Sequence, residues 1–248
     1  MIPKIIHYCW FGRTPLPKLV ETCISSWRQF FPGYEIREWN ETNFDVTSTA
    51  YTSEAYDAGK YAFVSDYVRL MVLHEYGGLY FDTDVEVIRS FTNSMLSRQF
   101  LACEKQGYTI TIAPGLAMGF YPKDDFIKQM LNSYDGQHFM ATNGEMNLST
   151  INVRVSNYFL KRGWQLEDSL QTIGSIVIYP SEYFCPFDGL TQKMHKTNNT
   201  FAIHWYMSSW IDQSLLKKFK KGIKRILPQH IYLFMFKGRK KTLSLPET

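Results

Sequence analysis

Residues 79–85, with the sequence LYFDTDV, constrain the fold of this chain more than any other segment. A short apolar run ends there in two carboxylates, Asp82 and Asp84, which are separated by one residue. Two glycines, Gly77 and Gly78, stand immediately before the run. Residues 62–75 before them place apolar side chains at helical spacing. This order predicts a helix, a tight turn and a buried strand whose end carries the carboxylate pair.

The carboxylate pair indicates metal chemistry. Two aspartates at positions i and i+2 of an extended strand point to the same face. Carboxylate oxygens are hard ligands that select Mg²⁺, Mn²⁺ or Ca²⁺, and two of them bind weakly unless substrate phosphates share the metal shell. The pattern therefore predicts a metal-bound diphosphate, with the cation stabilising a phosphate leaving group. Two surface aspartates at a strand end are the alternative.

Other side chains could belong to the same site. Asp66 and Arg69 are three residues apart on the predicted helix, so they lie on one face. They form either a surface ion pair or a pair that points into a cleft beside the metal. His204 ends the last apolar strand and, with the nearby Ser208, could complete the metal shell if that strand lies beside the carboxylate pair. A core histidine with satisfied hydrogen bonds is the alternative for His204.

The chain opens with the pattern of a β-α-β unit. Residues 4–9 and 34–39 read as strands, and residues 17–31 between them have helical spacing that ends at Pro32. Such a unit predicts the start of a parallel sheet. Further strands are expected at 85–88, 100–104, 109–113, 116–121 as a partner of 109–113, 176–179 and 201–205, and further helices near 53–58, 124–134 and 143–162.

The charge is distributed unevenly, although the formal net charge is only +4. Residues 215–248 contain ten Lys or Arg and one acid, whereas acids outnumber bases before them, which argues against a nucleic-acid surface on the body. Residues 215–227 have the pattern of a basic amphipathic helix, and the aromatic run 231–236 follows. We therefore expect a domain at 1–214 and a tail at 215–248 that binds anionic lipid. A helix that packs on the body with a solvated charged face is the alternative.

The four cysteines are scattered without a CxxC spacing, which favours small buried thiols in a reducing cytosol. The start of the chain has no signal-peptide pattern, and no apolar run approaches the roughly 20 residues of a spanning helix. The expected location is the cytoplasm, with peripheral attachment to the inner face of the membrane.

Three segments resemble motifs of the DXD-containing sugar transferases, a family that includes bacterial capsule and O-antigen transferases and the glucosylating domains of clostridial toxins. They are residues 2–12 (IPKIIHYCWFG), residues 62–84 and residues 204–210. The first two are together highly specific and cover about the first 90 residues, whereas the middle of the chain matches only loosely. The resemblance implies a GT-A fold, which is an α/β domain with a Rossmann-like central sheet, flanking helices and a nucleotide-sugar site that uses Mn²⁺ or Mg²⁺.

The resemblance also implies residue roles by position. Trp10 would stack on the nucleotide base, Asp84 would be the more direct metal ligand, and Asp66 and Arg69 would act with Asp84 in catalysis. The nucleotide-sugar site would comprise Tyr8, Trp10, Asp66, Arg69, Tyr80, Asp82 and Trp210, and the metal site Asp82, Asp84, His204 and Ser208.

These expectations describe a metal-dependent retaining glycosyltransferase. By resemblance its donor would be a UDP-sugar, and its acceptor would be a glycan, lipid-linked if the tail binds membrane, in capsule or O-antigen synthesis. Glu104 and Asp188 are candidate acceptor-side carboxylates. A haloacid-type phosphatase that uses Asp82 and Asp84 is one alternative, although Glu86 stands where that family has Thr or Val. A sugar-binding module without turnover is the other.

Overall fold

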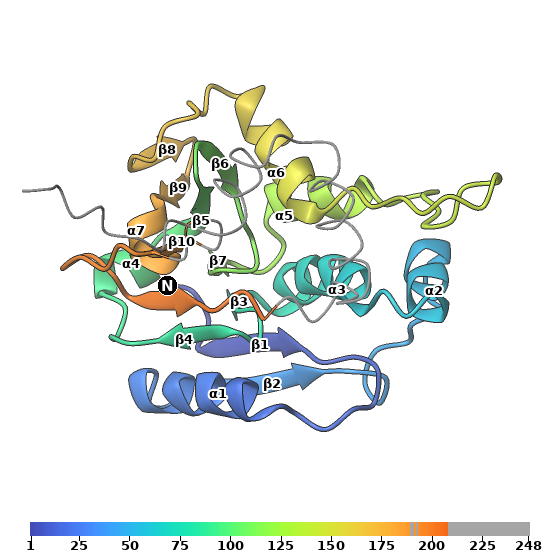
Figure 1. The fold of residues 1–248 in the computed structure, drawn as a ribbon, viewed down its shortest axis with the longest axis horizontal. Coiled ribbons are helices and arrows are strands. Elements are labelled where there is room, and N and C mark those ends of the chain that lie inside the picture. Colours follow the sequence, from blue (N-terminus) through green and yellow to red (C-terminus); the bar gives the residue numbers. More distant parts are fainter. Residues whose placement is uncertain (189–190, 192, 208–248) are drawn as a thin grey trace, which may run out of the picture.

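The computed structural model describes residues 1–188, 191 and 193–207. Their main feature is an eight-stranded sheet in the order β2-β1-β3-β7-β5-β9-β8, with β6 paired to β5 (Figure 1). Its strands are β1 (Ile5–Cys9), β2 (Glu35–Trp39), β3 (Gly78–Tyr80), β5 (Gln99–Gln106), β6 (Thr109–Ile112), β7 (Met118–Phe120), β8 (Gln171–Ile173) and β9 (Ile176–Tyr179).

The predicted β-α-β opening is confirmed. Strand β1 pairs in parallel with β2 on one side and with β3 on the other, and helix α1 (Lys18–Phe30) connects β1 to β2. Helix α1 also holds strand β4 (Val85–Val87). The indole of Trp27 donates to the carbonyl of Val85 at 2.8 Å, and the hydroxyl of Ser26 accepts the Val87 N–H at 2.9 Å. The segment that follows the carboxylate pair is therefore fixed to the first helix.

The second half of the sheet differs from the sequence-based expectation. Residues 116–121 were expected to pair with 109–113, but β6 pairs with β5, and β7 lies antiparallel between β3 and β5. All three residues of β7 are buried, whereas only Ile112 of the four residues of β6 is buried, so β7 suits the centre of a sheet and β6 its edge. Gly119 permits this position, because a Cβ there would lie 2.4 Å from the ring of Phe100.

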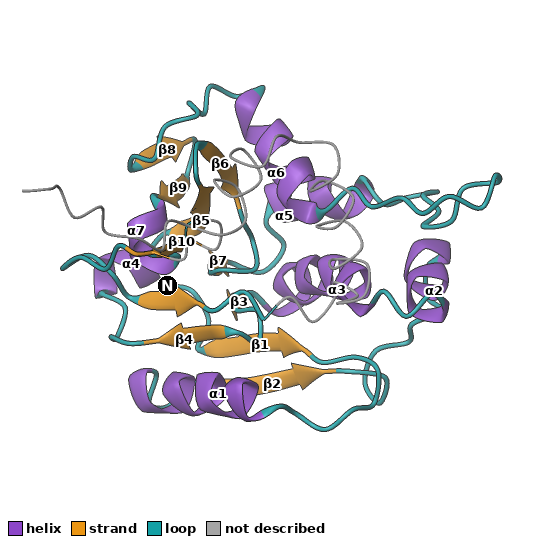
Figure 2. Ribbon diagram, viewed as in Figure 1, coloured by secondary structure: helices purple, strands orange, loops and turns teal. Residues whose placement is uncertain are grey.

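Helices cover both faces of the sheet (Figure 2). One buried apolar cluster includes residues of α3, α5 and α6, and a second includes residues of α1, β4 and α7. The helices are α2 (Ala50–Asp57), α3 (Tyr61–Tyr76), α4 (Asn93–Leu96), α5 (Asp125–Asn132), α6 (Ile151–Leu160) and α7 (Ser181–Phe184). The predicted α/β domain with a Rossmann-like start and flanking helices is confirmed.

The predicted helix, turn and strand at the centre of the chain are confirmed. Helix α3 ends at Gly77, which has a φ of 64°, and Gly78 follows with a φ of 107°. These left-handed values favour glycine. A Cβ on Gly78 would also lie 2.6 Å from the carbonyl oxygen of Ile5, so the turn lets β3 approach β1 closely.

The helix expected at 143–162 begins only at Ile151. In the segment before it, side chains take the backbone N–H groups that a helix would need. Asn143 accepts from the Glu145 N–H, and Asn147 accepts from the Ser149 N–H. The helix expected near 53–58 corresponds to α2, which begins earlier, with Thr49 as its N-cap.

Two short two-stranded sheets complete the described structure. Strand β12 (Ala202–His204) lies antiparallel to β4, and β10 (Phe187–Asp188) lies antiparallel to β11 (Lys193–Met194). The four cysteines are free and buried, as expected. Within the described ranges, no helix has both the length and the apolar content that crossing a bilayer requires.

His7 makes the stability of this fold depend on pH. Its fully buried ring has Nδ1 3.1 Å from the indole Nε1 of Trp39 and Nε2 2.9 Å from the carbonyl oxygen of Gly77. Because the indole only donates and the carbonyl only accepts, a neutral imidazole satisfies both contacts. Burial lowers the pKa of His7 to about 4.

We therefore expect the protein to lose stability as the pH falls from the unfolded-state pKa of histidine, near 6.5, towards 4. The unfolded state binds the proton in that window and the native state does not. Between pH 7 and pH 5 the free energy of unfolding should fall by about 2 kcal/mol through His7 alone. Urea unfolding of the wild type and of His7→Asn at both pH values measures this. An equal pH dependence in the two proteins would contradict the assignment.

Candidate active site

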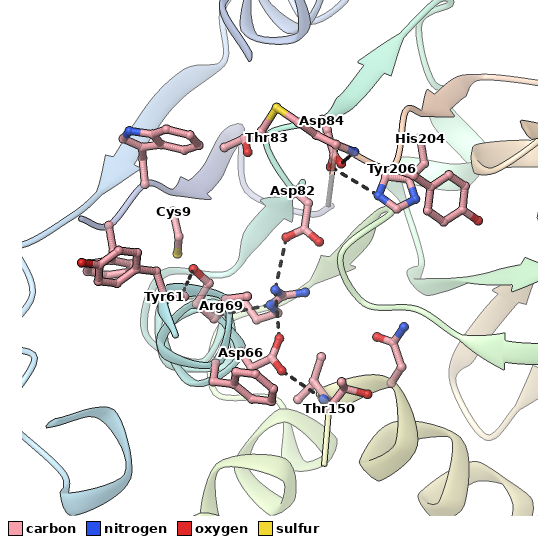
Figure 3. A pocket seen from close by; sticks show the side chains of 18 of the residues that line it. Cys9, Tyr61, Asp66, Arg69, Asp82, Thr83, Asp84, Thr150, His204 and Tyr206 are labelled. Atoms are coloured by element: carbon pink, nitrogen blue, oxygen red, sulfur yellow. Dashed lines mark hydrogen bonds and ion pairs between the residues drawn. The ribbon is translucent and has the colours of Figure 1, made fainter. Parts of the chain in front are cut away.

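A cleft of about 1000 Å³ opens where β1 and β3 end (Figure 3). Its walls come from the end of β1, from α3, from the turn at 82–84, from β5, from the start of α6 and from residues 204–207. The carboxyl ends of strands in open α/β sheets are where such folds bind ligands. Segments from both halves of the described chain therefore line this one cleft.

A buried arginine with two carboxylates lies at the base of this cleft. Nη2 of Arg69 lies 3.0 Å from Oδ1 of Asp66 and 3.2 Å from Oδ1 of Asp82. The side chains of Arg69 and Asp66 are 5% and 9% exposed, so the surface ion pair left open by the sequence is not what forms. The guanidinium also lies 4.9 Å from the centroid of the Tyr80 ring. Arg69 thus carries a fixed positive charge into the cleft wall.

Asp66 is shared between Arg69 and helix α6. Its Oδ2 accepts the backbone N–H of Ile151 at 3.1 Å, while Thr150, at the N-cap position, makes no side-chain cap. A carboxylate at a helix N-terminus is favoured by the helix dipole. Burial raises the pKa of Asp66 to about 6, and the neighbouring Arg69 offsets part of that rise.

Asp82 and Asp84 do not point to one face of an extended strand, as the sequence suggested. Strand β3 ends at Tyr80, and residues 82–84 form a turn in which the Val85 N–H donates to the Asp82 carbonyl. The turn sends the two carboxylates to different partners. Asp82 faces Arg69, and Asp84 faces His204, although both line the same cleft. Their side chains are 33% and 12% exposed, respectively.

The pairing of β12 with β4 brings His204 to Asp84. Nε2 of His204 lies 3.3 Å from Oδ1 of Asp84, and the Met207 N–H donates to Oδ2 at 2.8 Å. Burial would raise the pKa of Asp84, but His204 and the Met207 N–H outweigh it, so that pKa is lowered. Burial likewise opposes charge on His204, yet Asp84 beside it raises the pKa of the ring well above its usual value.

Asp84 and Nε2 of His204 lie close enough together to offer one carboxylate and one imidazole to a divalent cation, donors that Mn²⁺ accepts. Asp82 lines the same cleft but is paired with Arg69, and within the described residues it does not form a three-ligand cluster with Asp84 and His204. Asp84 favours the protonated, positively charged form of His204. A cation bound between the two side chains would replace that proton as the positive charge beside Asp84.

Gly115 is a site residue that the sequence analysis missed. Its carbonyl accepts the Asp82 N–H at 2.7 Å, and a Cβ built on it would lie 1.7 Å from Oδ2 of Asp82 and 3.0 Å from Nη1 of Arg69. Glycine is required here for space beside the carboxylate rather than for its φ. The only signal in the sequence was the Pro114–Gly115 dipeptide after a strand, which usually marks a turn.

The structure divides the remaining candidates. Trp10 lines the cleft partly buried, with its indole donating to the Thr14 carbonyl at 2.7 Å, and Tyr80 lines it almost fully buried. Tyr8 does not line the cleft. Alternation along β1 turns it towards α1, where its ring meets the edge of Trp27 and its hydroxyl donates to Glu38 at 2.6 Å.

Of the two acceptor-side candidates, Glu104 lines the cleft near His204. Asp188 lies in β10 outside the cleft lining, where its carboxylate accepts the N–H groups of Gly107 and Thr191. Ser208, Trp210 and the whole of residues 215–248 lie outside the described residues.

The steric role of Gly115 can be tested by a double-mutant cycle on stability. Gly115→Ala should destabilise the protein by about 1–3 kcal/mol, because the added methyl group overpacks the buried pair of Asp82 and Arg69. The cost should shrink in an Asp82→Ala background, where the clashing carboxylate is absent. Urea denaturation of the four proteins measures the coupling. Equal costs in both backgrounds would show that Asp82 is not what the methyl group meets.

Several solved structures described as glycosyltransferases match this chain, with TM-scores below 0.5. They include the PaToxG glycosyltransferase, at 17% identity and a TM-score of 0.47 over 64% of this chain and 69% of that one. A glycosyltransferase involved in glycosylation of the major capsid of PBCV-1 matches at 11% and 0.47 over 84% and 95%. The galactosyltransferase LgtC, in complex with donor and acceptor sugar analogues, matches at 14% and 0.44 over 98% of each chain. At these values the matches assign neither residues nor activity.

The sequence provides a more specific match. A comparison with curated protein sequences gives no match. The sequence model of a family described as capsular polysaccharide synthesis protein matches residues 1–145, which include Asp66, Arg69, Asp82, Asp84 and Gly115. This match agrees with the resemblance to bacterial capsule transferases. Because it covers more than half of the 248 residues, the chain belongs to the capsular polysaccharide synthesis protein family.

Proposed function

We propose that this protein is a metal-dependent, retaining glycosyltransferase of the GT-A type. It would move a sugar from a nucleotide-diphosphate donor to a glycan acceptor in capsular polysaccharide synthesis. The observation that carries the proposal is the cleft in which Asp82, Asp84, Arg69 and His204 meet at the ends of β1 and β3. Membership of a capsule synthesis family supports the same substrate class.

Asp84 and His204 would hold Mn²⁺ or Mg²⁺, with Asp82 as a third ligand or a ribose contact. When bound, the cation supplies Lewis-acid stabilisation of the departing diphosphate. Arg69 adds a second positive charge that is preorganised, because Asp66 and Asp82 fix its guanidinium before any donor arrives. A fixed charge needs no reorganisation when negative charge develops on the leaving phosphate.

The partly buried Trp10 offers an aromatic face at one side of the same cleft, which suits a nucleotide base. By the sequence resemblance this base is uracil. The acceptor hydroxyl would attack from the face that the diphosphate leaves, so that the anomeric configuration is retained. The carboxylates of Asp66 and Asp82 in the cleft wall are suited to accept hydrogen bonds from sugar hydroxyls.

The phosphatase alternative fits the site less well. A haloacid-type phosphatase would use the first aspartate of the pair as nucleophile, but Asp82 is engaged by Arg69 at 3.2 Å and by the Tyr80 hydroxyl at 3.3 Å. An ion-paired carboxylate is a poorer nucleophile than a free one. A binding module without turnover would keep the same contacts, so only an activity measurement separates it from a transferase.

The decisive experiment is a panel of nucleotide sugars incubated with the protein and Mn²⁺. We expect slow release of free nucleotide from one donor, and this release should fall by at least about 100-fold in Asp84→Asn, since a ligand charge is lost. Asp188→Asn, outside the cleft, is the matched control. Asp84 is buried, so the substitution also costs about 1 kcal/mol of stability, and circular dichroism must show a folded variant.

Three outcomes would contradict the proposal in different ways. Normal turnover by Asp84→Asn would remove the metal from the mechanism. Phosphate release from a generic phosphoester without a nucleotide sugar would favour the phosphatase. Donor binding without release of nucleotide would favour the binding module.

We further propose that residues 215–248 attach the protein to anionic lipid at the cytoplasmic face of the membrane, where a lipid-linked acceptor would be presented. The support is the sequence pattern of ten basic residues and one acid beside an aromatic run.

A protein that ends at residue 214 should therefore no longer sediment with anionic vesicles, whereas the full chain should. Each basic residue near such a surface contributes about 1 kcal/mol of binding, so binding by the full chain should fall steeply with added salt. Neutral vesicles are the control. Equal sedimentation of the two proteins with anionic vesicles would contradict membrane attachment through this segment.

A further inference from the structure

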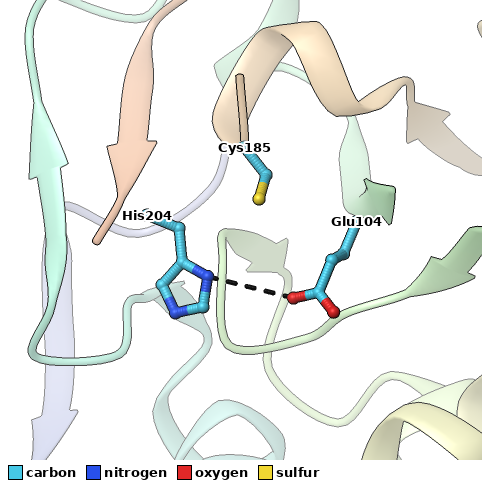
Figure 4. Close-up of side chains that lie close together, drawn as sticks. All are labelled: Glu104, Cys185 and His204. Carbon is cyan, nitrogen blue, oxygen red and sulfur yellow. Dashed lines mark ion pairs between the residues drawn. The ribbon is translucent and has the colours of Figure 1, made fainter. Parts of the chain in front are cut away.

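A second group of three possible metal ligands, which includes a thiol, lies on the Nδ1 side of the His204 ring. Glu104 comes from β5, Cys185 follows α7, and His204 ends β12 (Figure 4). One ligand atom of each lies within 4.8 Å of those of the other two. The function proposed above needs only Nε2 of His204, and it leaves Nδ1 and the thiol without a role.

Nδ1 of His204 is buried and has no hydrogen-bond partner in the described part of the chain. Nε2 faces Asp84 at 3.3 Å, which turns Nδ1 towards Oε2 of Glu104 at 3.9 Å, beyond hydrogen-bond distance. A buried polar atom without a hydrogen-bond partner destabilises the folded state. A ligand bound between these side chains would give Nδ1 a partner.

The other two donors each have a hydrogen-bonding neighbour. Oε1 of Glu104 accepts from the Gln106 amide at 2.7 Å, so Oε2 is the oxygen nearer the cluster. The hydroxyl of Tyr206 lies 3.0 Å from Sγ of Cys185, and its ring lies 4.2 Å from the His204 ring, centroid to centroid. Partners behind the donors are typical of metal sites, where they orient the ligands.

We propose that Sγ of Cys185, Nδ1 of His204 and Oε2 of Glu104 form a binding site for a borderline or thiophilic divalent cation such as Zn²⁺. Thiolate and imidazole donors select this class over Mg²⁺ and Mn²⁺. Bonds of about 2.0–2.3 Å put the ligands of a tetrahedral ion roughly 3.5 Å apart. The donors must therefore close by about 1 Å, which the unbranched side chain of Glu104 can supply.

Binding requires the thiolate and a deprotonated Nδ1, so the proton of the thiol and any proton on Nδ1 leave to solvent. The Tyr206 hydroxyl can then donate to the thiolate. Nε2–H meanwhile remains directed at Asp84, which gives His204 the carboxylate partner that metal-bound imidazoles commonly have. Because an ion at Nδ1 leaves the ring proton on Nε2, it competes for His204 with a hard cation that would bind at Nε2.

The site can be tested without any assay of sugar transfer. Co²⁺ is added to the full-length, chelator-stripped protein, and the thiolate-to-cobalt charge-transfer absorption is followed. We expect one equivalent to produce the band and Zn²⁺ to abolish it by displacement. Cys185→Ser should lose the band and bind Zn²⁺ at least about tenfold more weakly. Cys103→Ser, at a buried thiol in β5 one residue before Glu104, is the matched control and should keep both.

Glu104→Gln provides a second variant that leaves the thiol in place. It should keep the cobalt band and weaken Zn²⁺ binding by about tenfold, because one anionic ligand becomes neutral. The site is disproved if the unchanged protein gives no band, or if the band persists in folded Cys185→Ser. Both outcomes are independent of whether the protein transfers sugar, so failure here is distinguishable from failure of the proposed function.

Discussion

The cleft depends on one buried cation, the guanidinium of Arg69. A charge removed from water is costly unless it is paired and hydrogen-bonded. Here two carboxylates from different segments, Asp66 in α3 and Asp82 in the turn after β3, share that role. Asp66 in turn holds the first N–H of α6. The position of a helix about 85 residues further along the chain is thereby tied to the same ion pair.

The second organising element is the ring of His204, which stands between two groups of donors. On one side lie the carboxylates of the turn, which suit a hard cation, and on the other lie a thiol and the carboxylate of Glu104. In the two metal sites proposed above, the cation that this ring would bind depends on which of its nitrogens is deprotonated. The protonation of one side chain would therefore decide between the two proposed sites.

The sequence was informative wherever local pattern and long-range packing agree. The apolar periodicity of α3, the glycines after it and the β-α-β opening predicted the framework that positions Asp66, Arg69, Asp82 and Asp84. The order of β6 and β7 was not predictable, because it depends on which strand is buried on both faces.

Two features of the site could not be predicted from local sequence patterns for a similar reason. Gly115 matters through a carboxylate that lies more than 30 residues earlier in the chain, and such proximity leaves no local pattern. Tyr8 was placed by motif resemblance alone, although alternation along β1 directs it away from Cys9, which lines the cleft. A side chain's direction on a strand therefore deserves as much weight as its place in a motif.

The distance along the chain between Asp84 and its partners has a consequence for biosynthesis. His204 and Met207 lie some 120 residues after Asp84 and are the last described parts of the domain to leave the ribosome. Until then the nascent chain carries a carboxylate without the imidazole and the N–H that later offset its desolvation. Closure of the domain around this aspartate thus waits until residues 204–207 have been made, so a chain that ends before them lacks the contacts that allow the carboxylate to be buried as an anion.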